Sequence, residues 1–294
     1  MSAVSQVDAG IDAWLDAVAQ RIARDAPELR ALFDVYAGEA RFGRRFIAAE
    51  LARLPSGARV LEVGAGSYLL SSQLAREGFD VVALEPVGQG FSHFRRMQEI
   101  VSQLAAEMQC MPRVLRVEAE CLDASNAHDF AFSINVMEHV GDVAAVIERV
   151  AASLRQGARY RFTCPNYAFP YEPHFNMPTL FSKPLTERWM AKRIFGNRQL
   201  DDPAGTWRSL NWITVGEIAR VVRRHPDLRV RFRRDLLTST LERVVHDPQF
   251  AARRSALMRA GIATLVRTGL HRAPAALPAS MLPIIDCEIE RRAP

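Results

Sequence analysis

The chain has 294 residues, 49% of them hydrophobic, and a net charge of +5, which suits a full α/β core with an additional lobe. It lacks a run of about 20 apolar residues that would span a membrane and the interleaved basic and aromatic residues of a nucleic-acid track. Residues 1–30 carry charges throughout and do not resemble a secretion signal, so we expect none there. Its four cysteines have no paired spacing and no His, Asp or Glu cluster has convincing metal-ligand spacing, so we expect a reduced, cytoplasmic protein without a metal.

The first 54 residues are predicted to be helical. Apolar residues recur at helical spacing from Ile11 to Ile22, and a second helical region runs from about Glu28 to Leu54. Both helices precede the first predicted strand of the sheet.

The segment VLEVGAG predicts a buried strand that ends in a tight glycine turn. Arg59–Val63 is short, apolar and rich in β-branched residues, while Gly64 and Gly66 allow the backbone to approach a ligand closely. A helical pattern opens at Ser67, so the free N–H groups of a helix start would face the same ligand. Glu62 places a carboxylate beside the turn, which suits a ligand that carries an ammonium group.

Four further strands are predicted, and helical patterns alternate with them. Asp80–Leu84 is apolar and leads into Glu85, a position suited to binding ribose hydroxyls. The next strands are expected at Leu115–Val117, Phe130–Ile134 and Tyr160–Cys164. Asp142 caps a predicted helix that Gly157 ends. This alternation argues for a parallel sheet with helices on both faces.

Five segments occur in the order and spacing of one known family. They are VLEVGAG (60–66), the strand ending at Glu85, EAECL (118–122), FAFSINVMEHV (130–140) and LRQGARYRFTCPN (154–166). Together they resemble the motifs of the class I, Rossmann-like methyltransferases that use S-adenosylmethionine. The resemblance implies an α/β fold with a doubly wound, seven-stranded, mostly parallel sheet. It further implies a helical lid (1–54) and a cofactor-binding core (55–166).

The resemblance also implies roles for the residues of the glycine turn. Glu62 and the turn formed by Gly64, Ala65 and Gly66 match the loop that binds the methionine part of S-adenosylmethionine. Glu85 matches the residue that binds both ribose hydroxyls of that cofactor.

Three further positions match the cofactor site of the family, and one departs from it. Glu118 and Ala119 match the loop beside the adenine amino group, and Asn135 matches the strand tip under the sulfonium. Tyr68 stands where the family usually has a third glycine. Its side chain is therefore expected to cover the methionine end of the cofactor or to gate the substrate.

The segment 167–212 is rich in aromatic residues and is expected to bind the substrate. It follows the carboxyl end of a strand, where ligands of open α/β folds bind. We consider His174 and Glu172 as candidates for the base that takes the substrate proton, with His139 as a third. The substrate-binding candidates are Tyr68, Tyr167, Tyr171, Phe175, Trp207 and Arg208. The alternative is that the aromatic segment only packs on the core.

The last part of the chain, 213–294, is expected to complete the sheet. Leu228–Phe232 is the predicted sixth strand and Ile284–Ile289 the candidate seventh, so about 236–282 becomes an inserted helical lobe. The stretch 250–272 combines apolar residues with arginines. It is either a core-facing helix with a solvated basic face or a peripheral contact with an anionic membrane or a lipid-linked substrate.

These features predict an S-adenosylmethionine-dependent methyltransferase that acts by in-line transfer on an oxygen of a small-molecule, glycan or lipid-linked acceptor. Nitrogen and carbon acceptors and the oligomeric state stay open. A nicotinamide-dependent oxidoreductase would share the sheet and Glu85, but would have glycine in place of Leu69 and an apolar residue in place of Glu62. A non-catalytic binding or scaffold protein, supported only by Tyr68, and an RNA methyltransferase are further alternatives.

Overall fold

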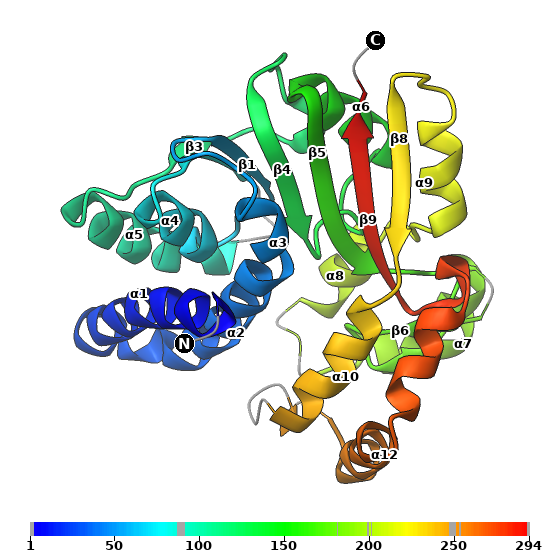
Figure 1. Cartoon of the computed structure of the whole chain (residues 1–294). Helices are drawn as coiled ribbons and strands as arrows, with labels where there is room; N and C mark the ends of the chain where they lie inside the picture. Colours follow the sequence, from blue (N-terminus) through cyan, green and yellow to red (C-terminus); the bar gives the residue numbers. More distant parts are fainter. Residues whose placement is uncertain are drawn as a thin grey trace. The chain divides into compact units, whose positions relative to one another are not determined.

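The computed structural model describes residues 3–86, 92–180, 182–198, 200, 202–246, 251–252 and 254–292. Its main sheet has seven strands in the order β3-β2-β1-β4-β5-β9-β8 (Figure 1). These strands are β1 (Arg59–Val63), β2 (Asp80–Leu84), β3 (Arg113–Leu115), β4 (His128–Ile134), β5 (Leu154–Pro165), β8 (Leu228–Arg233) and β9 (Ile284–Arg291). The pairs β1–β2, β1–β4 and β2–β3 are parallel, and β9 runs opposite to β8. This topology confirms the expected α/β fold class.

Helices occupy most connections between the strands. They are α1 (Ala3–Asp25), α2 (Arg30–Phe46), α3 (Ala48–Leu51), α4 (Leu69–Arg76), α5 (Ser92–Glu107), α6 (Val143–Ser153), α7 (Lys183–Phe195), α8 (Pro203–Ser209), α9 (Val215–Val222), α10 (Leu236–His246) and α12 (Ala256–Arg267). Short 3-10 helices are η1 (Pro27–Leu29), η3 (Ala119–Cys121), η4 (Leu270–Ala276) and η5 (Ala279–Met281). Among the described residues, no helix is both long enough and apolar enough to cross a membrane.

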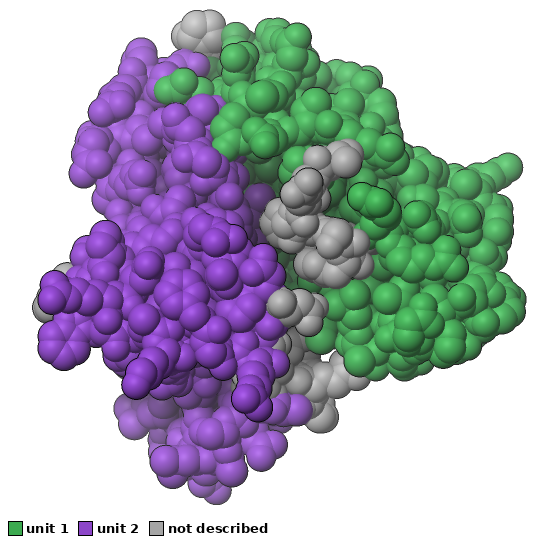
Figure 2. All heavy atoms as spheres, turned by 180° about the vertical axis from the view of Figure 1, so that it is seen from behind, with its two compact units in different colours: residues 1–134, 148–161, 291–293 green, residues 135–147, 162–290, 294 purple. Residues whose placement is uncertain are grey.

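The chain forms two compact units, which Figure 2 colours separately. Unit 1 comprises residues 1–134, 148–161 and 291–293, and unit 2 comprises residues 135–147, 162–290 and 294. All predicted cofactor-binding residues except Asn135 belong to unit 1. The three candidate bases belong to unit 2.

The N-terminal helices of unit 1 are tied to the helix that follows the glycine turn. Helix α1 contacts α2, α4 and α5. The Trp14 side chain is fully buried, and its Nε1–H donates to the carbonyl of Leu69 at 2.9 Å. Arg44 forms an ion pair of 2.9 Å with Glu77, the residue after α4. These contacts hold α4 in place; the role of α1–α3 as a lid stays a prediction.

Strands β1 and β2 have the predicted bounds, whereas β3 lies two residues earlier than expected. β3 is an edge strand, and its side chains are exposed or half-buried. Its pairing with β2 uses the backbone of Arg113, Val114 and Leu115, while Val117 is 40% exposed. An edge strand buries few of its side chains, so apolar residues in the sequence do not mark where it begins and ends.

The expected end of the sixth helix at Gly157 is wrong, because α6 ends at Ser153 and β5 begins at Leu154. Gly157 lies inside β5 with a φ of 78°. The Ser153 hydroxyl donates to the carbonyl of Val150 at 2.7 Å. Arg291, far along the chain in β9, donates to the carbonyls of Ala152 and Leu154. These partners satisfy carbonyls at the helix end that would otherwise be left open.

In unit 2, part of the aromatic segment forms a small hairpin. β6 (Tyr171–Glu172) pairs antiparallel with β7 (Met177–Pro178), and the turn 173–176 between them contains His174. Helices α10 and α12 with η4 and η5 lie between β8 and β9 in the sequence. Of the stretch 250–272, Phe250 and Arg253 lie outside the described residues.

Candidate functional site

The glycine turn after β1 is held against the end of β2. The N–H groups of Gly64 and Ala65 both donate to the carbonyl of Leu84, at 2.8 and 3.1 Å. The N–H of Gly66 donates to the Glu85 carboxylate at 2.8 Å. Gly64 and Gly66 have φ values of 73° and 51°, in the left-handed region that glycine adopts most easily. The turn therefore keeps the Glu85 carboxylate beside the backbone of Gly66.

Tyr68 adopts the same left-handed conformation as these glycines. It is the N-cap of α4 with a φ of 64°. For a residue with a Cβ atom this conformation costs about 1–2 kcal/mol, a cost that glycine avoids. Burial, together with the charge of nearby Glu85, raises the pKa of the Tyr68 hydroxyl. The departure from the usual third glycine thus places a strained, buried tyrosine beside Glu85.

Two buried carboxylates flank the turn without a cationic partner among the described residues. Glu62 and Glu85 are only 7% and 6% exposed. Burial raises the pKa of Glu62 to about 8, against a hydrogen bond from the Ser71 hydroxyl, and the charge of Glu85 raises it further. Burial also raises the pKa of Glu85, although the Gly66 N–H counteracts it. Such a pair fits a ligand that supplies a positive charge and hydroxyl donors.

The other predicted cofactor residues lie at strand ends or in short connections. Glu118 is exposed and precedes η3, in which Ala119 is buried. Asn135 directly follows β4, is exposed, and has a φ of 54°, while its N–H donates to the carbonyl of Thr163 at 2.8 Å. The sequence did not point to Gln98, whose amide donates to the carbonyl of Gly66 at 2.6 Å.

In unit 2, Glu172 is a fully buried hydrogen-bond acceptor at the base of the hairpin. It accepts the N–H of Phe175 and His174 Nδ1–H, both at 2.6 Å, and the hydroxyl of Tyr167 at 3.2 Å. Burial by itself would lower the pKa of His174, but the hydrogen bond and charge of Glu172 outweigh burial and raise that pKa. The structure therefore places these two candidate bases in direct contact.

The third candidate, His139, lies beside a buried acid that the sequence analysis did not select. Its Nδ1 is 2.8 Å from the hydroxyl of Ser209, and burial lowers the pKa of His139 to about 4. The neighbouring Glu138 side chain is fully buried, and neither of its carboxylate oxygens has a hydrogen-bond partner among the described residues. Burial raises the pKa of Glu138 to about 7.

Asn211 fixes the loop that carries Glu138 and His139. Its side-chain amide donates to the carbonyls of Met137 and Val140 at 2.7 and 2.9 Å, and its N–H donates to the carbonyl of Glu138 at 2.8 Å. Asn211 lies some seventy residues after this loop in the sequence, so the local sequence pattern could not indicate its role. The loop geometry therefore depends on a contact that only the fold creates.

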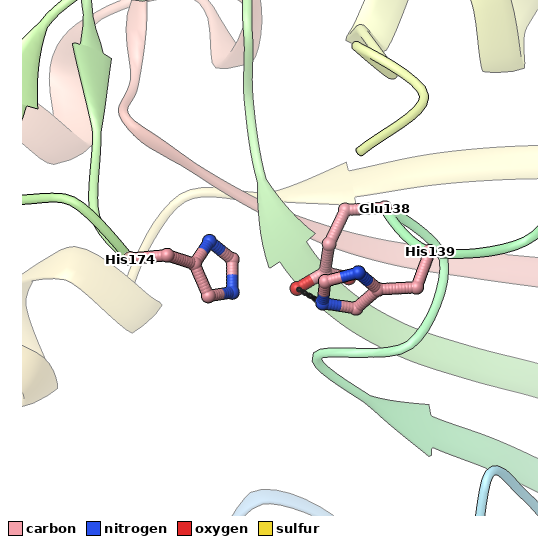
Figure 3. Close-up of side chains that lie close together, drawn as sticks. All are labelled: Glu138, His139 and His174. Carbon is pink, nitrogen blue, oxygen red and sulfur yellow. Dashed lines mark ion pairs between the residues drawn. The ribbon is translucent and has the colours of Figure 1, made fainter. Parts of the chain in front are cut away.

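Glu138, His139 and His174 converge, as Figure 3 shows. One potential ligand atom from each residue lies within 4.8 Å of the others. The two imidazole rings meet edge to face with centroids 5.2 Å apart. Sequence spacing could not show this cluster because His174 comes from a separate hairpin.

Most predicted aromatic substrate residues pack against one another in unit 2. Tyr167 stacks on Trp212 with ring centroids 4.5 Å apart, and Phe175 meets Trp207 edge to face at 5.6 Å. Phe175 and Trp207 are 3% and 1% exposed, and the Trp207 indole donates to Glu187 at 2.7 Å. Their packing supports the hairpin; a contact with the substrate stays a prediction.

Two predicted substrate residues are more accessible. Tyr171 is half-buried and its hydroxyl donates to the side chain of Asn176 at 2.6 Å. Arg208 is exposed, and its carbonyl accepts from Lys183 at 3.0 Å. Their role in acceptor binding also stays a prediction.

Comparison with known proteins places the chain in a family. Residues 37–225 match the model of a methyltransferase domain. An uncharacterised protein of Mycobacterium tuberculosis is 47% identical over 98% of both chains. A ubiquinone biosynthesis O-methyltransferase of Paramagnetospirillum magneticum is 28% identical over 59% of this chain and 78% of that protein.

A solved structure is similar in fold. The S-adenosylmethionine-dependent methyltransferase of Mesorhizobium loti superposes with a TM-score of 0.51 at 14% identity, covering 83% of this chain and 96% of that one. The family match favours the methyltransferase expectation over a nicotinamide-dependent oxidoreductase. The chain belongs to the methyltransferase domain family, as its sequence motifs indicated, and its fold is similar to that of the Mesorhizobium loti enzyme.

Proposed function

We propose that this chain methylates a hydroxyl oxygen of a small-molecule, glycan or lipid-linked acceptor. The observation that carries this proposal is the pair formed by Glu172 and His174, in which a buried carboxylate holds Nδ1 of the imidazole at 2.6 Å. A hydroxyl needs to lose its proton during methyl transfer, whereas an amine depends much less on a base. The similarity to an O-methyltransferase of ubiquinone biosynthesis supports the same choice of acceptor atom.

The glycine turn and its two acids are the proposed cofactor site. S-adenosylmethionine would supply a methyl group on a sulfonium that is already activated for in-line attack. Glu62 would face the ammonium group and Glu85 the ribose hydroxyls, because both carboxylates are buried and neither has a cation among the described residues. The backbone of Gly64, Ala65 and Gly66 would allow close approach.

The proposed proton acceptor is Nε2 of His174. Glu172 accepts the hydrogen of Nδ1, which fixes the tautomer with a free lone pair on Nε2. The same carboxylate stabilises the imidazolium that forms when Nε2 takes the proton. His139 lies 5.2 Å away, ring to ring, and shapes the same site.

The experiment that tests the proposal identifies the methylated atom. Purified protein is incubated with S-adenosylmethionine carrying a 13C-methyl group and a fractionated small-molecule and glycolipid extract. We expect a product whose 13C-methyl resonance is that of a methyl ether. A methyl group on nitrogen or carbon would rule out the proposed acceptor class.

The matched variants are His174→Ala and His246→Ala. His246 is an exposed histidine at the end of α10 in the same unit. We expect His174→Ala to lower turnover by about 100-fold or more, in the range of general-base catalysis. Its affinity for S-adenosylhomocysteine should stay nearly unchanged. His246→Ala should turn over normally. Normal turnover of His174→Ala would remove this residue from the mechanism.

A further inference from the structure

Two imidazoles in unit 2 direct unprotonated nitrogens into one space. Nδ1 of His174 is 2.6 Å from the Glu172 carboxylate, which only accepts, so in the neutral imidazole Nδ1 carries the hydrogen and Nε2 the lone pair. The Ser209 hydroxyl donates to the carbonyl of Thr206 at 2.8 Å and therefore accepts from His139 Nδ1–H, also at 2.8 Å. This arrangement leaves Nε2 of His139 with its lone pair as well.

Glu138 brings a third set of lone pairs to the same space. Its side chain is fully buried, and neither carboxylate oxygen has a hydrogen-bond partner among the described residues. Oε1 lies 4.0 Å from Nε2 of His139, and Figure 3 shows His174 facing both residues. A buried carboxylate beside two imidazole lone pairs is costly unless it takes up a proton or a cation lies among them.

We propose that Glu138, His139 and His174 bind one divalent transition metal ion of the zinc class. Two imidazole nitrogens and one carboxylate oxygen form a common ligand set for such ions. Around a tetrahedral ion with bonds of about 2.1 Å, ligand atoms lie roughly 3.4 Å apart. The three donor atoms lie within 4.8 Å of one another, so small side-chain movements would close the site.

The surroundings of both histidines are those of metal ligands. Metal-binding histidines almost always donate their other ring N–H to a carboxylate, carbonyl or similar acceptor, which fixes the ring and its tautomer. Glu172 does this for His174, and Ser209 does it for His139. The carboxylates of Glu138 and Glu172 also supply negative charge that balances a divalent ion. This inference replaces the expectation of no metal that the sequence spacing suggested.

The role of the metal rests on the proposed O-methylation. Three protein ligands leave an open position at which the acceptor hydroxyl can bind, and a bound divalent ion lowers the pKa of that hydroxyl. The hydroxyl proton then passes to water. The oxygen forms its bond to the methyl carbon as the carbon–sulfur bond breaks and its electron pair stays on sulfur. In this state Nε2 of His174 is a ligand, and the metal replaces it as the agent that ionises the acceptor.

The test is a metal titration of the full chain after it has been stripped with a chelator. Co²⁺ serves as the probe because its visible absorption reports coordination by protein ligands, and Zn²⁺ is then added in competition. We expect one equivalent of Co²⁺ to bind and Zn²⁺ to displace it. Glu138→Gln, His139→Ala and His174→Ala should each weaken binding by at least about 10-fold, since even outer-shell changes reach that size.

The control variants alter one carboxylate and one histidine that lie outside the cluster. Glu242 lies beside His271 at 2.9 Å, so Glu242→Gln alters a comparable pair, and His246→Ala removes an exposed histidine. Both should bind Co²⁺ as the unaltered chain does. Glu138→Gln preserves the shape of the side chain, and its thermal unfolding shows whether the fold is intact.

The outcomes distinguish a failure of the proposed metal site from a failure of the proposed O-methylation. Absence of Co²⁺ binding, or equal binding by Glu138→Gln and the unaltered chain, would overturn the metal site but leave O-methylation with His174 as the base. Specific binding together with an N- or C-methylated product would retain the metal site and overturn the proposed acceptor. Specific binding with an O-methylated product that disappears on metal removal supports both.

Discussion

Glu85 combines a structural contact with a proposed contact to the cofactor. Its carboxylate already accepts the N–H of Gly66, at 2.8 Å. We expect Glu85→Ala to weaken S-adenosylhomocysteine binding by about 10- to 100-fold, because hydrogen bonds to charged groups contribute about 1.5–3 kcal/mol. Isothermal titration calorimetry measures the affinity, and circular dichroism checks that the fold is retained. Glu85→Gln keeps an oxygen that can accept the N–H of Gly66, so its affinity for S-adenosylhomocysteine should lie between those of Glu85→Ala and the unaltered chain. Unchanged affinity of Glu85→Ala would contradict the assigned role.

Glu62 should make cofactor binding release protons. Burial raises its pKa to about 8, so at neutral pH much of this carboxyl is protonated. An ammonium group beside it favours the charged form and lowers that pKa, so binding of S-adenosylhomocysteine should release protons and tighten as the pH rises towards 8. Calorimetry in two buffers with different ionisation enthalpies measures the released protons. Glu62→Gln should lose the part of the proton release that depends on Glu62. Identical proton release in this variant would show that another group titrates.

The proposed cofactor residues could be selected from the sequence, whereas the polar cluster could not. Glu62, Gly64 and Gly66 lie within five consecutive residues, so a local motif is enough to predict their role. Glu138 and His174 are brought together by a hairpin and by a loop that Asn211 fixes, and neither contact leaves a trace in sequence spacing.

Among the elements, β1 and β2 could be predicted to the residue, whereas β4 and β5 begin earlier than their predicted starts at Phe130 and Tyr160. β1 and β2 are buried in four of their five positions, so their apolar runs end where the strands end. At the junction of α6 and β5, Leu154 fits the helical stripe and is also buried as the first strand residue. An apolar residue that fits both the helical and the strand period cannot mark the boundary. At this boundary Arg291 from the last strand donates to the carbonyls of Ala152 and Leu154, a contact that the local sequence does not reveal.

Helix α12 lies in the stretch for which the sequence left a membrane contact as one of two alternatives. It buries none of its residues, and Leu257, Met258 and Leu265 are 85%, 41% and 40% exposed, with Arg259 and Arg267 on the same helix. We expect the protein to co-sediment with anionic phospholipid vesicles in a salt-sensitive manner. The double variant Leu257→Asp, Leu265→Asp should lose most of this binding.

The control for this measurement is Trp189→Asp. Trp189 is 71% exposed on α7, so the change removes an apolar side chain of the same unit without touching α12. Equal losses in the control and in the double variant would show that the binding is not specific to α12. If the unaltered chain does not bind vesicles, the membrane contact is wrong and the arginines of α12 only form a face exposed to solvent.

At the scale of the whole molecule, buried titratable groups in unit 1 should set the pH range of folding stability. His128 is fully buried, its Nε2 has no hydrogen-bond partner among the described residues, and burial lowers its pKa from 6.5 to about 4. Between these values the unfolded chain binds more protons, so the free energy of unfolding falls as the pH falls, by up to roughly 3 kcal/mol. Glu62 acts in the opposite direction: its pKa rises from 4.5 to about 8, so stability falls as the pH rises through this range.

The two effects oppose each other between pH 4.5 and 6.5, so their sum should decline below and above that interval. Scanning calorimetry of the unaltered chain from acid to alkaline pH measures the melting temperature. Glu62→Gln should flatten the decline from pH 6.5 to 8, and His128→Leu should flatten the decline at acid pH. Saturating S-adenosylhomocysteine should remove the alkaline decline from the unaltered chain, because its ammonium compensates the ionised Glu62. An alkaline decline that persists unchanged in Glu62→Gln would show that this carboxyl does not destabilise the empty fold.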